Sequence, residues 1–303
     1  MVSLDALLAI FAATLLPVFL LAAAGYGLAT FIPLDTRTMG RVLFYLATPA
    51  LVFRSLYTMT VDWIALQHMA LVSVGVLVIT ALLGWASTAG SSRPERSGLT
   101  LASAVGNNGN MGIPICLFAF GEVGAALAAI YYAVTSFLTN TVGVVVASAG
   151  RSSLRAALVR GLQAPMLYAA TLGLLLNRNG IEAPQNLYRA IDLLAGASIP
   201  LMLVLLGAQL RATRIRRGHF IIWRSMVVRL VASPLVALTL CWLLNISGVE
   251  RQVLVLQAAM PTAVITTVLA TEFDAAPPLV AAAVMFSTLA SMATLSIVIY
   301  ALS

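Results

Sequence analysis

Apolar residues fill the chain in long runs that short polar segments separate. The hydrocarbon core of a membrane is about 30 Å thick, so a helix of roughly 20 apolar residues can cross it. Runs of that length predict ten membrane-spanning helices, at residues 4–29, 37–57, 63–87, 97–119, 122–148, 154–176, 185–210, 219–244, 250–271 and 277–302. The separating segments, such as "SSRPERSG" and "NRNGIEAPQN", carry the prolines, glycines and charges that are typical of loops.

The composition also indicates a membrane protein. Hydrophobic residues make up 61% of the chain and charged residues 9%, with a mean hydropathy of +1.01. Soluble domains carry about 25% charged residues, so this chain cannot cover a globule with polar surface. The first apolar run begins beside Asp5 and lacks a basic segment and a cleavage pattern. We therefore expect it to be a retained helix and not a signal peptide.

All 17 basic residues are arginines, and most of them lie in short polar segments. This distribution indicates topology determinants and no nucleic-acid partner, because arginine-rich loops stay on the cytoplasmic side. With the N-terminus outside, the cytoplasmic side receives Arg37, Arg41, Arg93, Arg96, Arg151, Arg155, Arg160, Arg211, Arg214, Arg216 and Arg217. The other side receives only Arg54, Arg178, Arg189 and Arg251. We expect a bacterial inner-membrane protein with both termini in the periplasm.

Prolines recur at a nearly constant spacing in the two halves of the chain. The pairs are Pro17 and Pro165, Pro49 and Pro200, and Pro114 and Pro261, at offsets of 148, 151 and 147. They predict two repeats of five spans, 1–150 and 151–303. Because five is odd, the second repeat enters the membrane in the opposite direction. Inverted repeats with interrupted helices at matching positions are typical of secondary transporters.

The segment "GNNGNMGIP", at residues 106–114, interrupts an apolar run with asparagine, glycine and proline. Irregular backbone survives in a membrane only where protein or a cavity surrounds it. We predict that this segment, with its low helix propensity and its proline, divides the fourth span into two half-helices with an unwound middle, and that Pro261 breaks the ninth span more gently. If the two breaks cross near the midplane, inward-pointing helix N-termini would favour an anion.

The polar side chains near these breaks are candidates for binding such an anion. Amides and hydroxyls without a fixed charge can hold a carboxylate and still release it. The predicted substrate-binding residues are Asn107, Asn108, Asn110, Gly112, Pro114, Pro261, Thr262, Thr266, Thr48, Ser198, Tyr132 and Ser136. The alternative is that these residues only pack helices together and hydrogen-bond between them.

Two ionisable residues inside spans are candidates for an electrostatic or proton-relay role. Arg229 lies well inside the eighth span, where it could attract the anion, snorkel to the headgroups or pair within the bundle. His68 could relay a proton, or it could be a packing or hydrogen-bonding residue.

The sequence offers little support for a cofactor, a metal site or catalysis. Two cysteines and two histidines with this spacing are too few for a disulfide framework or metal cluster. Sequence motifs of hydrolases, zinc proteases and nucleotide-binding enzymes are absent from the chain. Near the breaks only Gln257, Thr262 and backbone carbonyls could hold sodium, so the sequence disfavours sodium coupling.

Several segments resemble the auxin efflux carrier family, particularly its bacterial members. "NMGIPICLFAFGE" is similar to that family's fourth span, and the stretch from "QAAMPTAVITT" to "LSIVIY" is similar to its last two. "LLAGASIPLMLVLLGAQL" resembles the seventh span. The similarity covers essentially the whole chain, without the long central loop of many plant members.

The resemblance implies an all-α fold of ten spans like that of sodium/proton antiporters and bile-acid carriers. A scaffold of spans 1, 2, 6 and 7 would face a mobile transport domain of spans 3–5 and 8–10, moving in an elevator-type mechanism. Family substrates are small organic anions such as malonate, malate and auxin, and the family asparagine that meets the carboxylate corresponds to Asn107. The lysine–aspartate pair of plant members cannot exist in a chain without lysine.

Other readings stay open at this point. Since related carriers often form dimers, the resemblance allows for a homodimer. A sodium-coupled symporter of the bile-acid-carrier type and a ligand sensor that kept the transporter fold are the alternatives to a carboxylate carrier.

Overall fold

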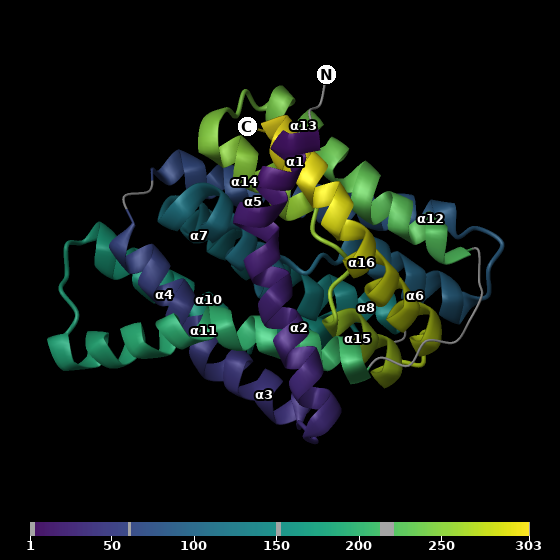
Figure 1. Ribbon diagram of the computed structural model, residues 1–303, viewed down its shortest axis with the longest axis horizontal. Helices are drawn as coiled ribbons and strands as arrows, with labels where there is room; N and C mark the ends of the chain where they lie inside the picture. Colours follow the sequence, from purple (N-terminus) through teal and green to yellow (C-terminus); the bar gives the residue numbers. More distant parts are fainter. Residues whose placement is uncertain (1–3, 60–61, 150–152, 213–220, 303) are drawn as a thin grey trace.

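The chain is helical throughout the part that the computed structural model describes, which is residues 4–59, 62–149, 153–212 and 221–302 (Figure 1). By length and composition, six helical stretches could cross a membrane: Leu8–Phe31, Trp63–Ser87, Asn108–Ala147, Gln185–Ala212, Ile221–Leu243 and Pro277–Leu302. The bent pair Arg155–Leu162 and Pro165–Arg178 gives a seventh. The chain is therefore a multi-pass membrane protein, as the hydropathy pattern predicts.

The helices are named in chain order, with η for a π-helical turn. The first part contains α1 (Leu4–Ile10), η1 (Phe11–Leu15), α2 (Leu16–Phe31), α3 (Thr36–Val42), η2 (Leu43–Ala47), α4 (Thr48–Thr58), α5 (Trp63–Ser87), α6 (Arg93–Ala104), η3 (Asn108–Gly112), α7 (Ile113–Leu138), η4 (Thr139–Gly143) and α8 (Val144–Ala147). The second part contains α9 (Leu154–Leu162), α10 (Pro165–Arg178), α11 (Gln185–Ala212), α12 (Ile221–Val227), η5 (Val228–Ala232), α13 (Ser233–Leu243), α14 (Gly248–Ala258), α15 (Ile265–Glu272) and α16 (Pro277–Leu302). Arg151, Arg214, Arg216 and Arg217, on which part of the predicted orientation depends, lie outside the described residues.

The π-helical turns η1, η2, η3 and η5 each end two residues before a proline. Proline lacks an N–H group, and its ring pushes against the carbonyl four residues back. The residue before the proline instead donates to the carbonyl five residues back, as Thr48 does to Leu43 and Ile113 to Asn108. This wider turn lets the helix continue past the proline. Pro114 itself therefore lies inside a continuous helix, and the break in this span falls before it, at residues 105–107.

Glycines bring two helix pairs into backbone contact. A Cβ atom on Gly25 of α2 would overlap the carbonyl oxygen of Val204 in α11. Gly207 of α11 lies in the same way against the carbonyl of Ala22. A Cβ atom on Gly173 of α10 would come within 2.9 Å of the carbonyl oxygen of Phe53 in α4. These close approaches join α2 to α11 and α10 to α4.

The helices form two groups. The helices α2, α4, α10 and α11 pack against one another, while α5 packs against α6, α7, α13 and α14, and α16 against α6, α12 and α15. In Figure 1 α3, α4, α10 and α11 lie at the lower left, and α6, α8, α12, α15 and α16 at the right. The groups meet where α7 contacts α4 and α10, and where η3 contacts α11. Both ends of the chain lie near each other at the top of the view.

Candidate functional site

The helix that contains α6 is interrupted directly before its run of asparagines. The first half, α6, ends at Ala104, residues 105–107 are not helical, and η3 begins at Asn108. The low helix propensity of glycine and asparagine explains why the interruption falls here and not at the following proline. The interruption therefore comes earlier than the position that Pro114 indicated.

A second interruption separates α14 from α15. Here residues 259–264 leave the helix, and Pro261 lies in the middle of them. This interruption is six residues long against three at 105–107, so the prediction of a gentler break at Pro261 is wrong. No helical turn directly precedes Pro261, so the π-helical turn that accommodates the other prolines cannot form there.

The two interruptions are hydrogen-bonded to each other. The backbone N–H of Asn107 donates to the carbonyl of Pro261 at 2.7 Å, and the N–H of Ala263 donates to the carbonyl of Val105 at 3.0 Å. These bonds make an isolated antiparallel bridge between Gly106 and Thr262. Two segments that would otherwise leave backbone groups unsatisfied in a membrane thus satisfy each other. We call residues 105–112 and 257–266 the crossover.

Asn108 and Gln257 connect the two sides of the crossover through their side chains. The Nδ2 amide of Asn108 donates to the backbone carbonyl of Gln257 at 2.7 Å and to its Oε1 atom at 2.9 Å. Asn108 is 5% exposed and Gln257 is fully buried. A Cβ atom on Gly112 would overlap the Gln257 side chain, so only glycine leaves room for it. Asn108 therefore fixes the position of Gln257.

Two buried amide donors at the crossover have no acceptor among the described residues. They are the Nδ2 atom of Asn107 and the Nε2 atom of Gln257. An unsatisfied buried donor costs about 1–3 kcal/mol, so such atoms call for a partner that the protein itself does not supply. The N–H groups of Gly109 and Asn110, in the first turn of η3, also find no acceptor within the described part of the chain. Together these groups gather hydrogen-bond donors without acceptors at the start of η3.

The two threonines that were predicted to offer hydroxyls are already engaged. Thr262 donates its hydroxyl to the carbonyl of Ala102 at 2.9 Å, and Thr266 donates to the carbonyl of Ala263 at 2.6 Å. The N–H of Thr262 donates to the hydroxyl of Ser287 in α16 at 3.1 Å. These bonds hold the second interruption in shape.

The other predicted residues lie in η3 and along α7. Asn110 is half-buried, and a Cβ atom on Gly109 would come within 2.6 Å of the Tyr132 ring. Ser136 is buried one turn further along α7. Pro114 is buried in the first turn of α7.

The predicted scaffold residues contact the opposite half of the chain. Ser198 of α11 donates its hydroxyl to the carbonyls of Ala47 and Leu194, and Thr48 is buried beside Ala47. The Ser198 hydroxyl is thus occupied within the protein. The helix that carries Ser198, α11, also contacts η3 of the crossover.

Arg229 and His68 both have partners inside the protein. Arg229 is 2% exposed and its guanidinium donates to backbone carbonyls, so it pairs within the bundle and does not snorkel to the headgroups. The Nδ1 atom of His68 in α5 lies 2.9 Å from a carboxylate oxygen of Glu250 in α14. His68 therefore hydrogen-bonds within the protein, which is one of the two roles that the sequence left open for it.

Sequence reasoning considered Gln257 only as a sodium ligand and missed it as an amide donor. The available signal was a glutamine inside an apolar span, four residues before a proline, since polar side chains in membranes are costly unless they have a role.

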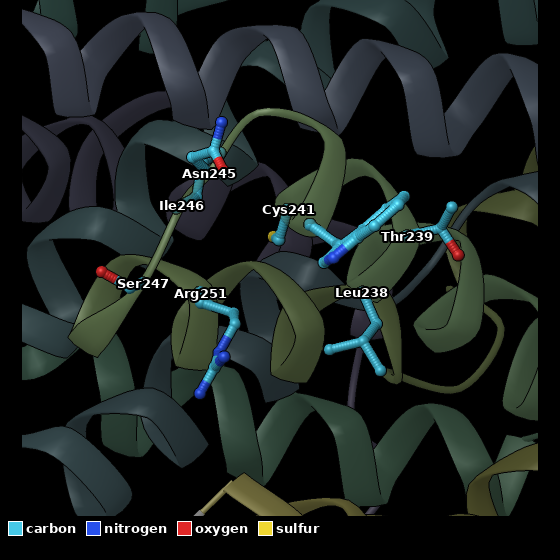
Figure 2. Close-up of a pocket in the computed structure, with 8 residues that line it drawn as sticks. Leu238, Thr239, Cys241, Asn245, Ile246, Ser247 and Arg251 are labelled. Carbon is cyan, nitrogen blue, oxygen red and sulfur yellow. The ribbon is translucent and has the colours of Figure 1, made fainter.

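A cavity of about 530 Å³ opens at the end of α14 that is far from the crossover. Its lining comes from α13, the α13–α14 connection and α14, and includes Trp242, Asn245 and Arg251 (Figure 2). None of the site residues predicted from the sequence lines it. The crossover, by contrast, holds the two buried amide donors without acceptors, on Asn107 and Gln257.

The chain matches the family of membrane transport proteins, that of the auxin efflux carriers, over residues 10–299. It belongs to this family. An "Uncharacterized transporter" of Methanothermobacter thermautotrophicus is 31% identical over 93% of this chain and 95% of its own length. A "Putative malonate transporter" of Rhizobium meliloti is 28% identical over 94% and 93%. A "Probable auxin efflux carrier component 1b" of Oryza sativa is 28% identical, over 42% of this chain and 24% of its own.

The match confirms the resemblance seen in the sequence. Because it runs from Ile10, the last residue of α1, to Ile299 in α16, it covers both interrupted helices. As an auxin efflux carrier family member, the chain is a membrane transporter, and the names of its relatives describe transporters too.

Proposed function

We propose that this family member is a secondary carrier for small organic anions, which it binds by a carboxylate group at the crossover. The observation that carries the proposal is the pair of buried amide donors without acceptors, on Asn107 and Gln257. A carboxylate offers the acceptor oxygens that such donors lack. The unpaired N–H groups at the start of η3 add the favourable end of a helix dipole.

A neutral set of donors suits a carrier better than a binding protein. A lysine or arginine ligand would form a strong charge-assisted pair with the carboxylate and slow its release. The name of the Rhizobium meliloti relative makes malonate the first probe, with monocarboxylates and other dicarboxylates beside it.

Contacts between the two halves support ten spans in two inverted repeats, 1–150 and 151–303. Gly25 packs against Val204, and Gly173 packs against Phe53. These two contacts are related by offsets of 148 and 151, which are the offsets of the first two proline pairs. Inverted repeats related by a two-fold axis would produce such paired contacts.

Two more features fit ten spans. The hydroxyl of Ser198 donates to the carbonyl of Ala47, and the two residues are 151 positions apart. This is the offset of the second proline pair, so they would be equivalent residues of the two repeats that meet at the two-fold axis. The backbone of Gly121 leaves helical geometry (φ 68°, ψ −162°), which would separate a fourth span from a fifth.

An elevator-type motion is the alternating-access mechanism that this arrangement supports. The backbone contacts between α2 and α11 and between α4 and α10 would make spans 1, 2, 6 and 7 a rigid scaffold. The crossover belongs to the other group of helices but touches α11 through η3. A bound anion would therefore lie at the boundary across which the groups slide.

The nearness of the two termini fits an even number of spans. Together with the arginine distribution, it supports an orientation in a bacterial inner membrane with both ends outside.

Asn107→Ala tests the proposed site. We expect malonate, or another carboxylate of the panel, to raise the melting temperature of the purified wild-type protein. The variant should bind that ligand about 10–100-fold more weakly, since a hydrogen bond to a charged group contributes about 1.5–3 kcal/mol. Its melting temperature without ligand should not fall, because the amide that is removed bonds nothing in the free protein. Titration by melting temperature or calorimetry measures both effects.

The matched control is Asn179→Ala, which removes an exposed amide at the end of α10 that bonds only the carbonyl of Leu175. It should bind the carboxylate like the wild type. Equal affinity in Asn107→Ala and Asn179→Ala, or a wild type that no carboxylate of the panel stabilises, would contradict the proposal.

A further inference from the structure

Arg229 is a fully buried arginine whose hydrogen bonds go to neutral oxygens. One guanidinium nitrogen, Nη1, donates to the carbonyl of Ala104 at 2.9 Å and lies 3.4 Å from that of Ser103. The other, Nη2, donates to the carbonyl of Ala258 and to the hydroxyl of Ser233. That hydroxyl in turn donates to the carbonyl of Ala258 at 2.7 Å.

These carbonyls belong to the ends of the two interrupted helices. Ala104 is the last residue of α6, and Ala258 is the last residue of α14. The last carbonyls of a helix have no partner within it and carry roughly half a negative charge in total. Arg229 thus joins the negative ends of the two helices that lead into the crossover.

The charge of Arg229 is not neutralised by an acid. The ion pairs within the described residues are those of Arg54 with Asp192, His68 with Glu250 and Arg160 with Glu272. A cation inside a membrane is costly unless it is paired or coordinated. Here coordination by helix ends takes the place of a carboxylate.

Three carbonyl oxygens and one hydroxyl oxygen form the kind of ligand set that a bare monovalent cation takes. Carbonyl oxygens replace the hydration shell of such an ion in the filters of cation channels. In this chain the guanidinium fills the space between the oxygens. Its Cζ atom also comes within 3.4 Å of where a Cβ atom on Gly106 would lie, so the charge adjoins the crossover itself.

We propose that the guanidinium of Arg229 is a built-in cation that does the work of a bound sodium ion at the crossover. It holds the ends of α6 and α14 together and leaves the opposite helix end, at the start of η3, to the anion. The carrier therefore needs no inorganic cation to assemble its site. The position of the cation follows from the hydrogen bonds of Arg229 alone. Only its importance for transport rests on the proposed anion site.

Arg229→Ala is the test, with purified protein and the melting temperature as readout. In choline chloride, the variant should melt at least about 5 °C below the wild type, because it leaves several buried carbonyls without a donor. Methylguanidinium or sodium at about 50 mM should restore at least half of the loss, because a ligand of the folded state stabilises it by mass action. The wild type should show the same melting temperature in sodium and in choline.

Arg224→Ala is the matched control. Arg224 lies five residues earlier along the same helical run, is exposed, and donates to the carbonyl of Ser87 at the end of α5. This variant should show no response to methylguanidinium or sodium. Arg229→Lys keeps a cation among the same oxygens and should melt between the wild type and Arg229→Ala without a cation response.

The proposal is overturned if Arg229→Ala responds to cations no more than Arg224→Ala does. It is also overturned if the wild type loses about 5 °C or more, or tenfold or more in malonate affinity, when choline replaces sodium. That wild-type measurement remains decisive if Arg229→Ala does not fold. A wild type that binds no carboxylate, with a normal cation response in Arg229→Ala, refutes the proposed anion site alone.

Discussion

Replacing Gln257 with glutamate is expected to abolish carboxylate binding while leaving the protein folded. The new side chain has nearly the same shape, and its oxygen can still accept the hydrogen bond from the Nδ2 amide of Asn108. The change removes the unpaired Nε2 donor and adds a negative charge beside the proposed anion. At a separation of about 5 Å and an effective dielectric constant of about 20, the repulsion is about 3 kcal/mol, or roughly 100-fold or more in affinity.

The matched control is Gln252→Glu, on the same helix. Gln252 donates to the carbonyl of Leu302 and lies at the end of α14 away from the crossover. Calorimetric titration with malonate should give wild-type affinity for this variant. The ratio of wild-type to Gln257→Glu affinity, compared at equal pH, should also shrink as the pH falls, because the introduced carboxyl then becomes neutral. A Gln257→Glu protein that binds within threefold of Gln252→Glu would refute the role of Gln257.

Gly207→Ala is expected to cost about 3 kcal/mol or more of stability, although it adds a single carbon atom. The new Cβ atom would overlap the carbonyl oxygen of Ala22 and lie 2.6 Å from the backbone nitrogen of Tyr26. Both are backbone atoms, so no side-chain rotation can relieve the overlap, and α2 and α11 must move apart. The melting temperature in detergent and the fraction that elutes as a single species measure the effect.

Gly196→Ala on the same helix is the control for this prediction. A Cβ atom at Gly196 would meet nothing within 4 Å. Alanine has a higher helix propensity than glycine by about 1 kcal/mol, so this variant should be as stable as the wild type or slightly more so. The two substitutions should therefore have opposite signs. Equal melting temperatures for both would show that the α2–α11 contact does not limit stability.

The sequence alone predicted a multi-pass helical membrane protein and the bounds of several of its helices. The run predicted at 185–210 corresponds to α11 (Gln185–Ala212), and the run at 277–302 to α16 (Pro277–Leu302). Hydropathy works here because the requirement is local: each span must satisfy its own backbone and face lipid along its own length. The resemblance of several segments to the auxin efflux carriers likewise identified the family.

The sequence also located the irregular segments but not the exact positions of their breaks. Asparagine, glycine and proline marked residues 106–114, and the break lies at 105–107. Pro114 itself lies within a helix, whereas Pro261 lies in an unwound segment. The two prolines differ in the backbone that precedes them: a π-helical turn precedes Pro114, whereas unwound backbone precedes Pro261. A π-helical turn can absorb a missing N–H group, and whether that turn forms depends on the helices packed around it.

Only the tertiary structure decided which polar groups are free to bind a ligand. Asn107 and Asn108 are neighbours of the same type, but Gln257 occupies the amide of Asn108 and nothing occupies that of Asn107. The sequence also left several roles open for Arg229. The structure shows that its guanidinium donates to the carbonyls at the ends of α6 and α14. A sequence lists donors and acceptors, whereas the pairing among them depends on residues about 150 positions away that the fold brings within 3 Å.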